Sequence, residues 1–155
     1  MLLGRISDIK SGLVLVRKKA AIQQEVKKTY NLITVKNIDD NGVINNEPYD
    51  KFESNEILEP IYFTEKNDIL IRLSYPYTAI FIDEEHSGLL VPSYFAIIKI
   101  KNDMFLPEYV ALYLNTEKVK QELLKSQTGT MMPSTNKNIL NGIAINQLSK
   151  EEQKK

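Results

Sequence analysis

The pattern of apolar and polar residues divides the chain into a short N-terminal helix, a central run of strands and a helical C-terminal part. Near the N-terminus, Leu3, Ile6 and Ile9 recur at helical spacing, which predicts a helix over residues 2–9. Gly12 is placed to end this helix, because glycine commonly follows the last helical turn.

Short apolar runs separated by turn residues dominate the middle of the chain. Runs rich in β-branched and aromatic residues, bounded by polar turn residues, are typical of strands. We therefore predict strands over residues 31–35, 69–73, 78–82, 89–91 and 94–100. Residues 20–30 and 45–59 lack clear periodicity, and we predict a lysine-rich loop and an acidic surface there. The close spacing of the later strands indicates an antiparallel β unit.

Helical spacing returns in the last third of the chain. It runs from Pro107 to Lys125, and proline is favourable at the first helical position. The polar pair Asn115 and Thr116 divides this stretch into two helices, and we expect Thr116 to cap the second. A polar loop over residues 126–138 follows. The predicted fold is therefore α/β (α+β), mainly an antiparallel β unit with flanking helices.

Length and composition are those of one ordinary globular domain. The chain has 155 residues, of which 43% are hydrophobic and 26% charged, so it can bury a core without disulfides or metals. It contains no cysteine, which excludes a disulfide framework, a thiolate zinc site and a cysteine nucleophile. The sequence has no apolar run of about 18 residues and no signal-like N-terminus. We expect a cytoplasmic protein without a membrane partner.

Charge is unevenly distributed along the chain, although the net charge is zero. Residues 1–37 carry eight basic and two acidic side chains, whereas residues 38–68 carry two basic and nine acidic ones. One interpretation is that the basic N-terminal third presents positive potential to phosphates while the acidic segment faces away. The other interpretation is that the two segments are solvated loops of opposite sign.

Motifs of the common nucleotide-dependent and hydrolytic enzymes are missing. The sequence has no GxxxxGK[ST] phosphate loop, and it lacks the glycine-rich loop and acidic-Pro-Pro-aromatic run of an amino-methyltransferase. Residues 83–86 place three acids beside His86, but adjacent acids on a turn usually face solvent. Glu152 and Lys154 have the spacing of a metal-dependent nuclease, yet no suitable aspartate precedes them. We therefore predict no catalytic residue, metal or cofactor.

Six segments, in order, resemble motifs of type I restriction–modification DNA specificity subunits. They are LGRISDIKSG at 3–12, KNDILIR at 66–72, the strands over 88–100, LPEYVALYLN at 106–115, QTGT at 127–130 and INQLSKEEQ at 145–153. The resemblance covers nearly the whole chain and rests on the order and spacing of these motifs. Asn67 replaces the glycine of the family's GDI turn and tolerates the same left-handed conformation. Asn146 and Gln147 replace prolines before the final EQ.

The resemblance implies one non-catalytic target-recognition domain over residues 1–148, with residues 149–155 beginning a truncated spacer helix. Such a domain reads one half of a bipartite site in double-stranded DNA. Its implied protein partners are the methyltransferase (M) subunit and, through it, the restriction (R) subunit. Two half-subunits could also associate with each other to imitate a full specificity subunit.

Three loops carry side chains suited to reading DNA, where base edges take hydrogen bonds and phosphates attract lysine, arginine and small polar groups. The basic loop supplies Arg17, Lys18, Lys19, Lys27, Lys28 and Tyr30. The strand-end loop supplies Arg72, Ser74, Tyr75 and Tyr77. The polar loop supplies Gln127, Thr128, Gly129, Thr130, Ser134, Thr135, Asn136 and Lys137. The alternatives are a solvated loop, core packing of the tyrosine pair and an ordinary helix-to-strand connection.

Two other functions stay open at this point. A protein-binding adaptor, or a degenerate recognition domain that engages the methyltransferase without reading DNA, fits the zero net charge and the acidic segment over residues 38–68. A small hydrolase would need a nucleophile beside a general base, and the sequence offers no such pair. Retention on duplex DNA separates the recognition domain from the adaptor.

Overall fold

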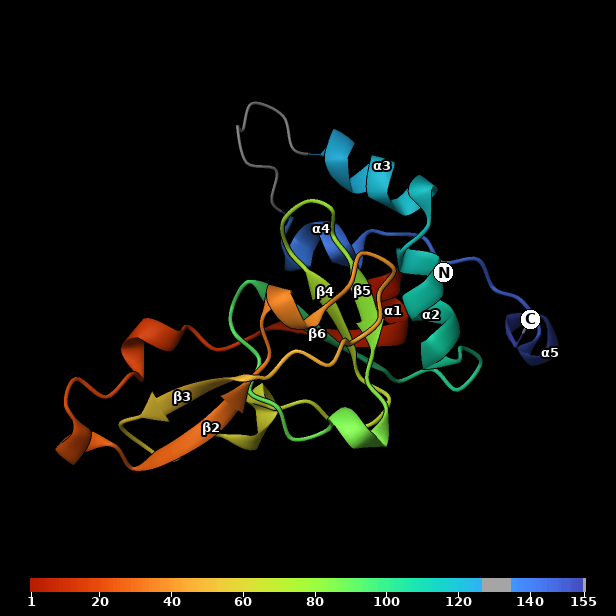
Figure 1. Cartoon of the computed structure of the whole chain (residues 1–155). Coiled ribbons are helices and arrows are strands. Elements are labelled where there is room, and N and C mark those ends of the chain that lie inside the picture. Colours follow the sequence, from red (N-terminus) through yellow and green to blue (C-terminus); the bar gives the residue numbers. More distant parts are fainter. Residues whose placement is uncertain (127–134, 155) are drawn as a thin grey trace.

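The structure is a computed structural model that describes residues 1–126 and 135–154 (Figure 1). Its strands are β1 (Ser7–Ser11), β2 (Lys28–Leu32), β3 (Asp50–Ser54), β4 (Ile69–Arg72), β5 (Ala79–Phe81) and β6 (Phe95–Ile100). Its α-helices are α1 (Leu3–Ile6), α2 (Pro107–Leu114), α3 (Glu117–Lys125), α4 (Lys137–Asn141) and α5 (Lys150–Gln153). Short 3-10 turns connect them, among them η1 (Leu15–Arg17), η2 (Gln23–Glu25) and η5 (Glu84–His86). The mixed α/β fold with antiparallel sheets and flanking helices is confirmed.

A four-stranded antiparallel sheet in the order β1-β6-β4-β5 organises the molecule. Successive residues of a strand point to opposite faces, so the apolar run of β4 can serve two cores. Ile69 and Ile71 face a core covered by α1, α2, α3 and α4, whereas Leu70 belongs to a second core. Irregular segments that contain Ile33 and Val91 complete this second core. The central strands are therefore buried on both faces.

A separate two-stranded ribbon, β2 paired with β3, projects from the sheet (Figure 1). Tyr30 lies opposite Phe52 in its register, and Phe52 is buried in a third cluster with Leu32, Leu58 and Leu90. The prediction that residues 45–59 form only acidic surface is therefore wrong, because β3 lies within them. Backbone hydrogen bonds from Ala20 and Lys27 to β3 attach the loop that precedes β2 to this ribbon.

Four other expectations from the sequence also need correction. The strand predicted over residues 31–35 is β2, which begins at Lys28 within the predicted lysine-rich loop and ends at Leu32. The helix predicted over residues 2–9 ends at Ile6, and β1 begins at the next residue. Residues 89–91 are buried but form isolated bridges rather than a strand, with Leu90 bridging to both Leu32 and Phe63. Thr116 stands at the start of α3, but its hydroxyl donates to the carbonyl of Tyr113 and does not cap the helix.

Two local predictions are confirmed. The stretch over residues 107–125 is divided into two helices at the Asn115–Thr116 pair. Asn67 has a φ of 76°, the left-handed conformation that the glycine of the related motif also permits. In the part of the chain that the structure describes, no helix has the length and apolarity needed to cross a membrane.

Replacing Phe52 with alanine is expected to lower the free energy of unfolding by about 3–5 kcal/mol, because it leaves a cavity in the cluster beneath the ribbon. Denaturant unfolding measures this change. Val43→Ala, at an exposed position, is the control and should change stability by less than about 0.5 kcal/mol. Equal effects of the two substitutions would contradict the packing described for Phe52.

Candidate nucleic-acid interface

Two of the predicted loops leave the same end of the four-stranded sheet. Strands β1 and β4 both pair antiparallel with β6, so they run in the same direction. Their C-terminal ends therefore lie at the same end of the sheet. Ser11 at the end of β1 lies opposite Ala96, and Arg72 at the end of β4 lies opposite Phe95. The basic loop follows β1 directly, and the strand-end loop follows β4.

The described C-terminal part of the polar loop, residues 135–137, lies at this same end. The amide of Thr135 donates to the carbonyl of Leu73 over 2.6 Å, which joins the loop to the residue after β4. Asn136 caps α4 by accepting a hydrogen bond from the amide of Ile139 over 3.0 Å, and Lys137 is the first residue of that helix. The other predicted residues of this loop, Gln127, Thr128, Gly129, Thr130 and Ser134, lie outside the described residues.

A groove runs along the outer side of β1, which is an edge strand. It consists of two shallow pockets of about 560 and 310 Å³ that share Lys10 and Ser11 in their linings. One pocket extends to Lys137, and the other extends to Arg17 and Lys18. The groove therefore connects the basic loop with the start of α4, two predicted site segments that are 120 residues apart.

The groove carries an excess of positive charge. Lys10, Arg17 and Lys137 are exposed, and the ammonium of Lys10 lies 4.7 Å from the ring centroid of Tyr62. The carboxylate of Asp8, which also lines it, forms an ion pair with Lys101 at 2.9 Å. Because the carboxylate of Asp8 is already paired with Lys101, it offsets little of the positive charge of the clustered cations. Such a cluster attracts a polyanion.

Sequence reasoning did not select Lys10 or Ser11 as site residues. Lys10 follows a predicted helix in the sequence, and only the pairing of β1 with β6 places it along an open sheet edge. Its Cα partner is Ile97, far along the chain. The only local signal was the high density of basic residues before residue 37.

The strand-end loop divides into an accessible part and a buried part. The Arg72 guanidinium donates from Nε to Ser74 Oγ over 3.3 Å, and both side chains are partly exposed. Tyr75 is 56% exposed and makes an edge-on contact with the Tyr77 ring, with centroids 5.9 Å apart. Tyr77 itself is fully buried in the main core, and burial raises its pKa. Its ring supports the loop from within and has no exposed surface to offer DNA.

A partly buried lysine fixes the strand-end loop to α3. Lys120 Nζ donates to the carbonyl of Pro76 over 2.5 Å. Burial lowers the pKa of Lys120, while the carboxylates of Glu117 and Asp40 act in the opposite direction. This contact holds the backbone beside Tyr75 in place, so the exposed ring projects from a supported turn.

The basic loop carries exposed lysines and leads to Tyr30, whose ring is packed against the fold. Lys19, Lys27 and Lys28 are exposed, and Lys28 Nζ lies 5.3 Å from the Tyr30 ring centroid. The Tyr30 hydroxyl accepts a hydrogen bond from the amide of Leu58, and its ring packs on Phe63 with centroids 5.1 Å apart.

The two charged segments are neighbours in the fold. Lys18 forms an ion pair of 2.6 Å with Glu56, and Lys36 forms one with Asp50. The acidic strand β3 pairs directly with β2 of the basic third. The interpretation in which the acidic segment faces away from the basic third is therefore wrong, and basic side chains line the groove along β1 instead.

The fold of this chain is similar to that of several solved structures. No family model and no curated protein matches the chain. The HsdS subunit from Thermoanaerobacter tengcongensis matches with a TM-score of 0.70 at 14% identity, covering 99% of this chain and 38% of that chain. A chain from a structural study of complex assembly and conformational transition of the type I R-M system matches with a TM-score of 0.68 at 13% identity, covering 92% and 35%.

The S subunit of the type I restriction–modification system from M. genitalium matches with a TM-score of 0.51 at 18% identity, covering 92% of this chain and 32% of that chain. This chain has the fold of a type I specificity subunit. It spans between 32% and 38% of the length of the three matched chains. The specificity-subunit fold extends over nearly all of this chain, in agreement with the motif order in its sequence.

In this specificity-subunit fold, the side chains gathered at the sheet end are mainly hydrogen-bond donors. Ammonium, guanidinium, hydroxyl and amide groups can contact phosphates and base edges. Within residues 1–126 and 135–154, no group of three histidine, cysteine, aspartate or glutamate side chains could hold a metal ion. His86 Nδ1 contacts Asp83 Oδ1 at 2.6 Å on η5, away from the groove lining.

The pKa of Tyr94 depends on two charged side chains at the sheet end. It precedes β6, and its pKa is raised by burial and by the carboxylate of Asp50, while the guanidinium of Arg72 acts in the opposite direction. Because a nearby cation stabilises the phenolate, Arg72→Met should raise the Tyr94 pKa further. Asp50→Asn should lower it. An NMR titration of tyrosine ring carbons measures both, and shifts of the same sign would contradict the placement of these side chains.

Proposed function

We propose that this domain recognises a specific sequence in double-stranded DNA and reads one half of a bipartite target for a type I restriction–modification complex. The observation that carries the proposal is that β1 and β4 end together beside the start of α4. This arrangement brings the start of the basic loop, the strand-end loop and the described residues 135–137 of the polar loop to one end of the sheet. The fold shared with specificity subunits supports the same function. The role is non-catalytic, and methylation and cleavage belong to other subunits.

The contacts divide into two kinds in this proposal. Lys10, Arg17 and Lys137 line the groove along β1 and contact phosphates, which sets the position of the domain on DNA. Arg72 and the amide of Asn136 lie at the end of the sheet and contact base edges. Their positions are fixed by hydrogen bonds within the fold, so they can discriminate between bases without large rearrangement.

The C-terminal residues support a proposed boundary between a recognition domain over residues 1–148 and the beginning of a spacer helix. Ser149 and Glu152 form a reciprocal capping box at the start of α5. The buried side chain of Gln153 accepts a hydrogen bond from the amide of Leu106 over 2.7 Å and donates to the carbonyl of Met104 over 2.8 Å. These contacts fix the direction of α5 relative to the domain.

We further propose that the M subunit and, through it, the R subunit are protein partners of this domain. One of the matched chains comes from a study of complex assembly in the type I R-M system. Association of two copies of the domain belongs to the same proposal, and sedimentation of the chain with and without a bipartite duplex tests it.

Simultaneous replacement of Lys10, Arg17 and Lys137 with glutamate should weaken binding to all duplexes about equally. Each phosphate contact contributes about 0.9 to the slope of log affinity against log salt, so the slope should fall in magnitude by roughly 2 to 3. Fluorescence anisotropy at several salt concentrations measures both quantities. The matched control carries glutamate at Lys66, Lys118 and Lys150, which are also exposed.

If the groove variant and the control bind DNA alike, the phosphate contacts assigned to the groove are wrong. If the wild-type chain binds a methyltransferase subunit but is not retained on any duplex at low salt, the chain is an adaptor and the proposed DNA recognition is wrong. Selective retention on one sequence supports the recognition domain.

Asn136→Asp should change which base is preferred at one position of the target. Aspartate can still cap α4, but it replaces the amide donor with a carboxylate that only accepts hydrogen bonds. The expected change in discrimination is about 1–3 kcal/mol at that position. Selection from a randomised duplex library, followed by sequencing, measures it. A uniform loss at all positions would instead make Asn136 a phosphate contact or a structural residue.

A further inference from the structure

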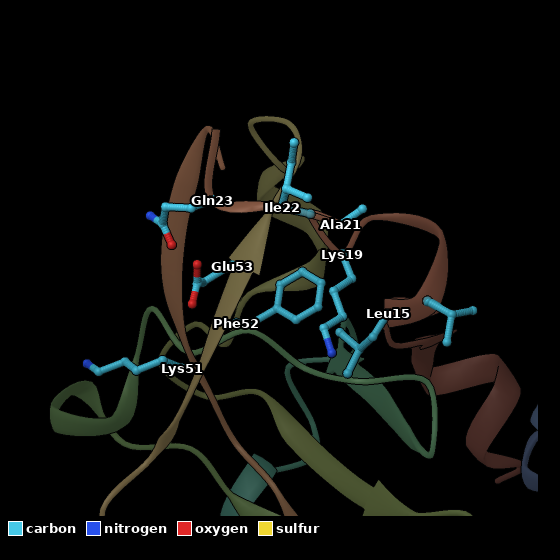
Figure 2. Close-up of a pocket in the computed structure, with 10 residues that line it drawn as sticks. Leu15, Lys19, Ala21, Ile22, Gln23, Lys51, Phe52 and Glu53 are labelled. Carbon is cyan, nitrogen blue, oxygen red and sulfur yellow. The ribbon is translucent and has the colours of Figure 1, made fainter. Parts of the chain in front are cut away.

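A second groove lies on the other side of η1, between the basic loop and β3 (Figure 2). Its volume is about 610 Å³. Leu15, Val16 and Ile22 line it from the basic loop, and Phe52 and Glu53 line it from β3. Figure 2 shows Phe52 at its centre, Gln23 and Glu53 to one side of that ring and Lys19 and Leu15 to the other. The groove thus combines an apolar lining with hydrogen-bonding groups at its side.

Two aliphatic side chains in this groove are unusually open to solvent. Val16 is 84% exposed and Ile22 is 56% exposed. A single exposed aliphatic residue needs no explanation, but here two β-branched side chains share one concave surface within a loop rich in lysine. Neither contributes to the three buried clusters. Their exposure leaves both side chains accessible to a ligand.

The backbone that carries these side chains is held at both ends. The amide of Ala20 donates to the carbonyl of Glu53 over 2.9 Å, and the amide of Lys27 donates to the carbonyl of Ser54 over 2.8 Å. Between these two contacts, η2 closes a tight turn beside Ile22. Because Phe52 is buried, β3 is anchored to the fold, and the two hydrogen bonds attach the opposite wall of the groove to it.

Charge indicates what kind of ligand fits. Lys19 and Lys51 line the groove, and Lys27 and Lys28 follow it in the chain, so phosphates are favoured around its rim. The carboxylate of Glu53 is exposed within the lining and would repel a phosphate placed inside. Base edges, which are uncharged and carry amino donors and methyl groups, suit the interior while the flanking phosphates contact lysines.

We propose that this groove reads an A·T base pair in the major groove, with Val16 and Ile22 contacting the thymine methyl group and Gln23 hydrogen-bonding to the adenine. A glutamine amide can pair with adenine N6 and N7, and an apolar side chain can contact the thymine C5-methyl group. The inference rests on the proposed DNA-recognition function. It adds the chemical identity of one base pair and the residues that select it.

The test uses the duplexes that the wild-type chain selects from a randomised library. Each thymine in the selected site is replaced in turn by deoxyuridine, which removes only the C5-methyl group. Wild-type binding should weaken about fourfold at one thymine, the value expected for burying one methyl group. The variant with Val16→Ala and Ile22→Ala should bind the thymine and deoxyuridine duplexes equally.

Two controls keep the result specific. The variant with Val43→Ala and Leu112→Ala removes aliphatic surface at exposed positions outside the groove and should keep the wild-type preference for thymine. Gln23→Ala should reduce the selectivity for adenine at the same base pair and leave the remaining positions of the selected sequence unchanged. Both aliphatic positions in the groove are exposed, so the alanine variant should fold normally.

The outcomes separate this inference from the function on which it rests. Selection of a sequence with no thymine sensitive to loss of its methyl group would overturn the groove assignment and leave DNA recognition intact. A methyl effect that persists in the Val16 and Ile22 variant would also overturn the assignment. If no sequence is enriched at all, both the proposed function and this inference are wrong.

Discussion

The pairing of β6 between β1 and β4 is the constraint on which the rest of the structure depends. Because β1 and β4 both run antiparallel to β6, their C-terminal ends lie on either side of the start of β6. The amide of Gly12 donates to the carbonyl of Phe95 over 3.0 Å, and the amide of Leu73 donates to the carbonyl of Tyr94 over 3.0 Å. The chain segments leaving β1 and β4 are thus both hydrogen-bonded to the start of β6. Gly12 and Leu73, which are 61 residues apart in sequence, are therefore held at the same end of the sheet.

The sequence predicted the elements whose hydrophobic pattern is long and regular. The run around β4 and the two helices over residues 107–125 have enough apolar positions to define their period. Strand β3 was missed because Phe52 is its single large apolar residue. Its second buried position is Ser54, whose hydroxyl donates to the carbonyl of Glu56 over 2.7 Å. A polar residue buried through a hydrogen bond leaves no hydrophobic pattern from which a strand can be predicted.

The candidate site was predictable in composition but not in arrangement. The density of basic residues pointed to Arg17, which lines the groove, but the same criterion did not distinguish Lys10 from the other basic residues. Charge along the chain was also misleading, because the acidic strand β3 pairs with β2 and Glu56 neutralises Lys18. Side-chain type cannot indicate exposure either, since Tyr75 faces solvent while Tyr77 is buried. The exposure and neighbours of these side chains depend on pairing between strands that are distant in sequence.

The basic loop, the end of β4 and the start of α4 are expected to form one continuous DNA-contacting surface. The most direct test is an NMR titration of the labelled chain with its selected duplex, followed through backbone amide shifts. We predict that the largest shifts fall within residues 10–28, 72–75 and 135–137, while α2 and β5 change little. Largest shifts on α2 and β5, with the sheet end unaffected, would contradict it.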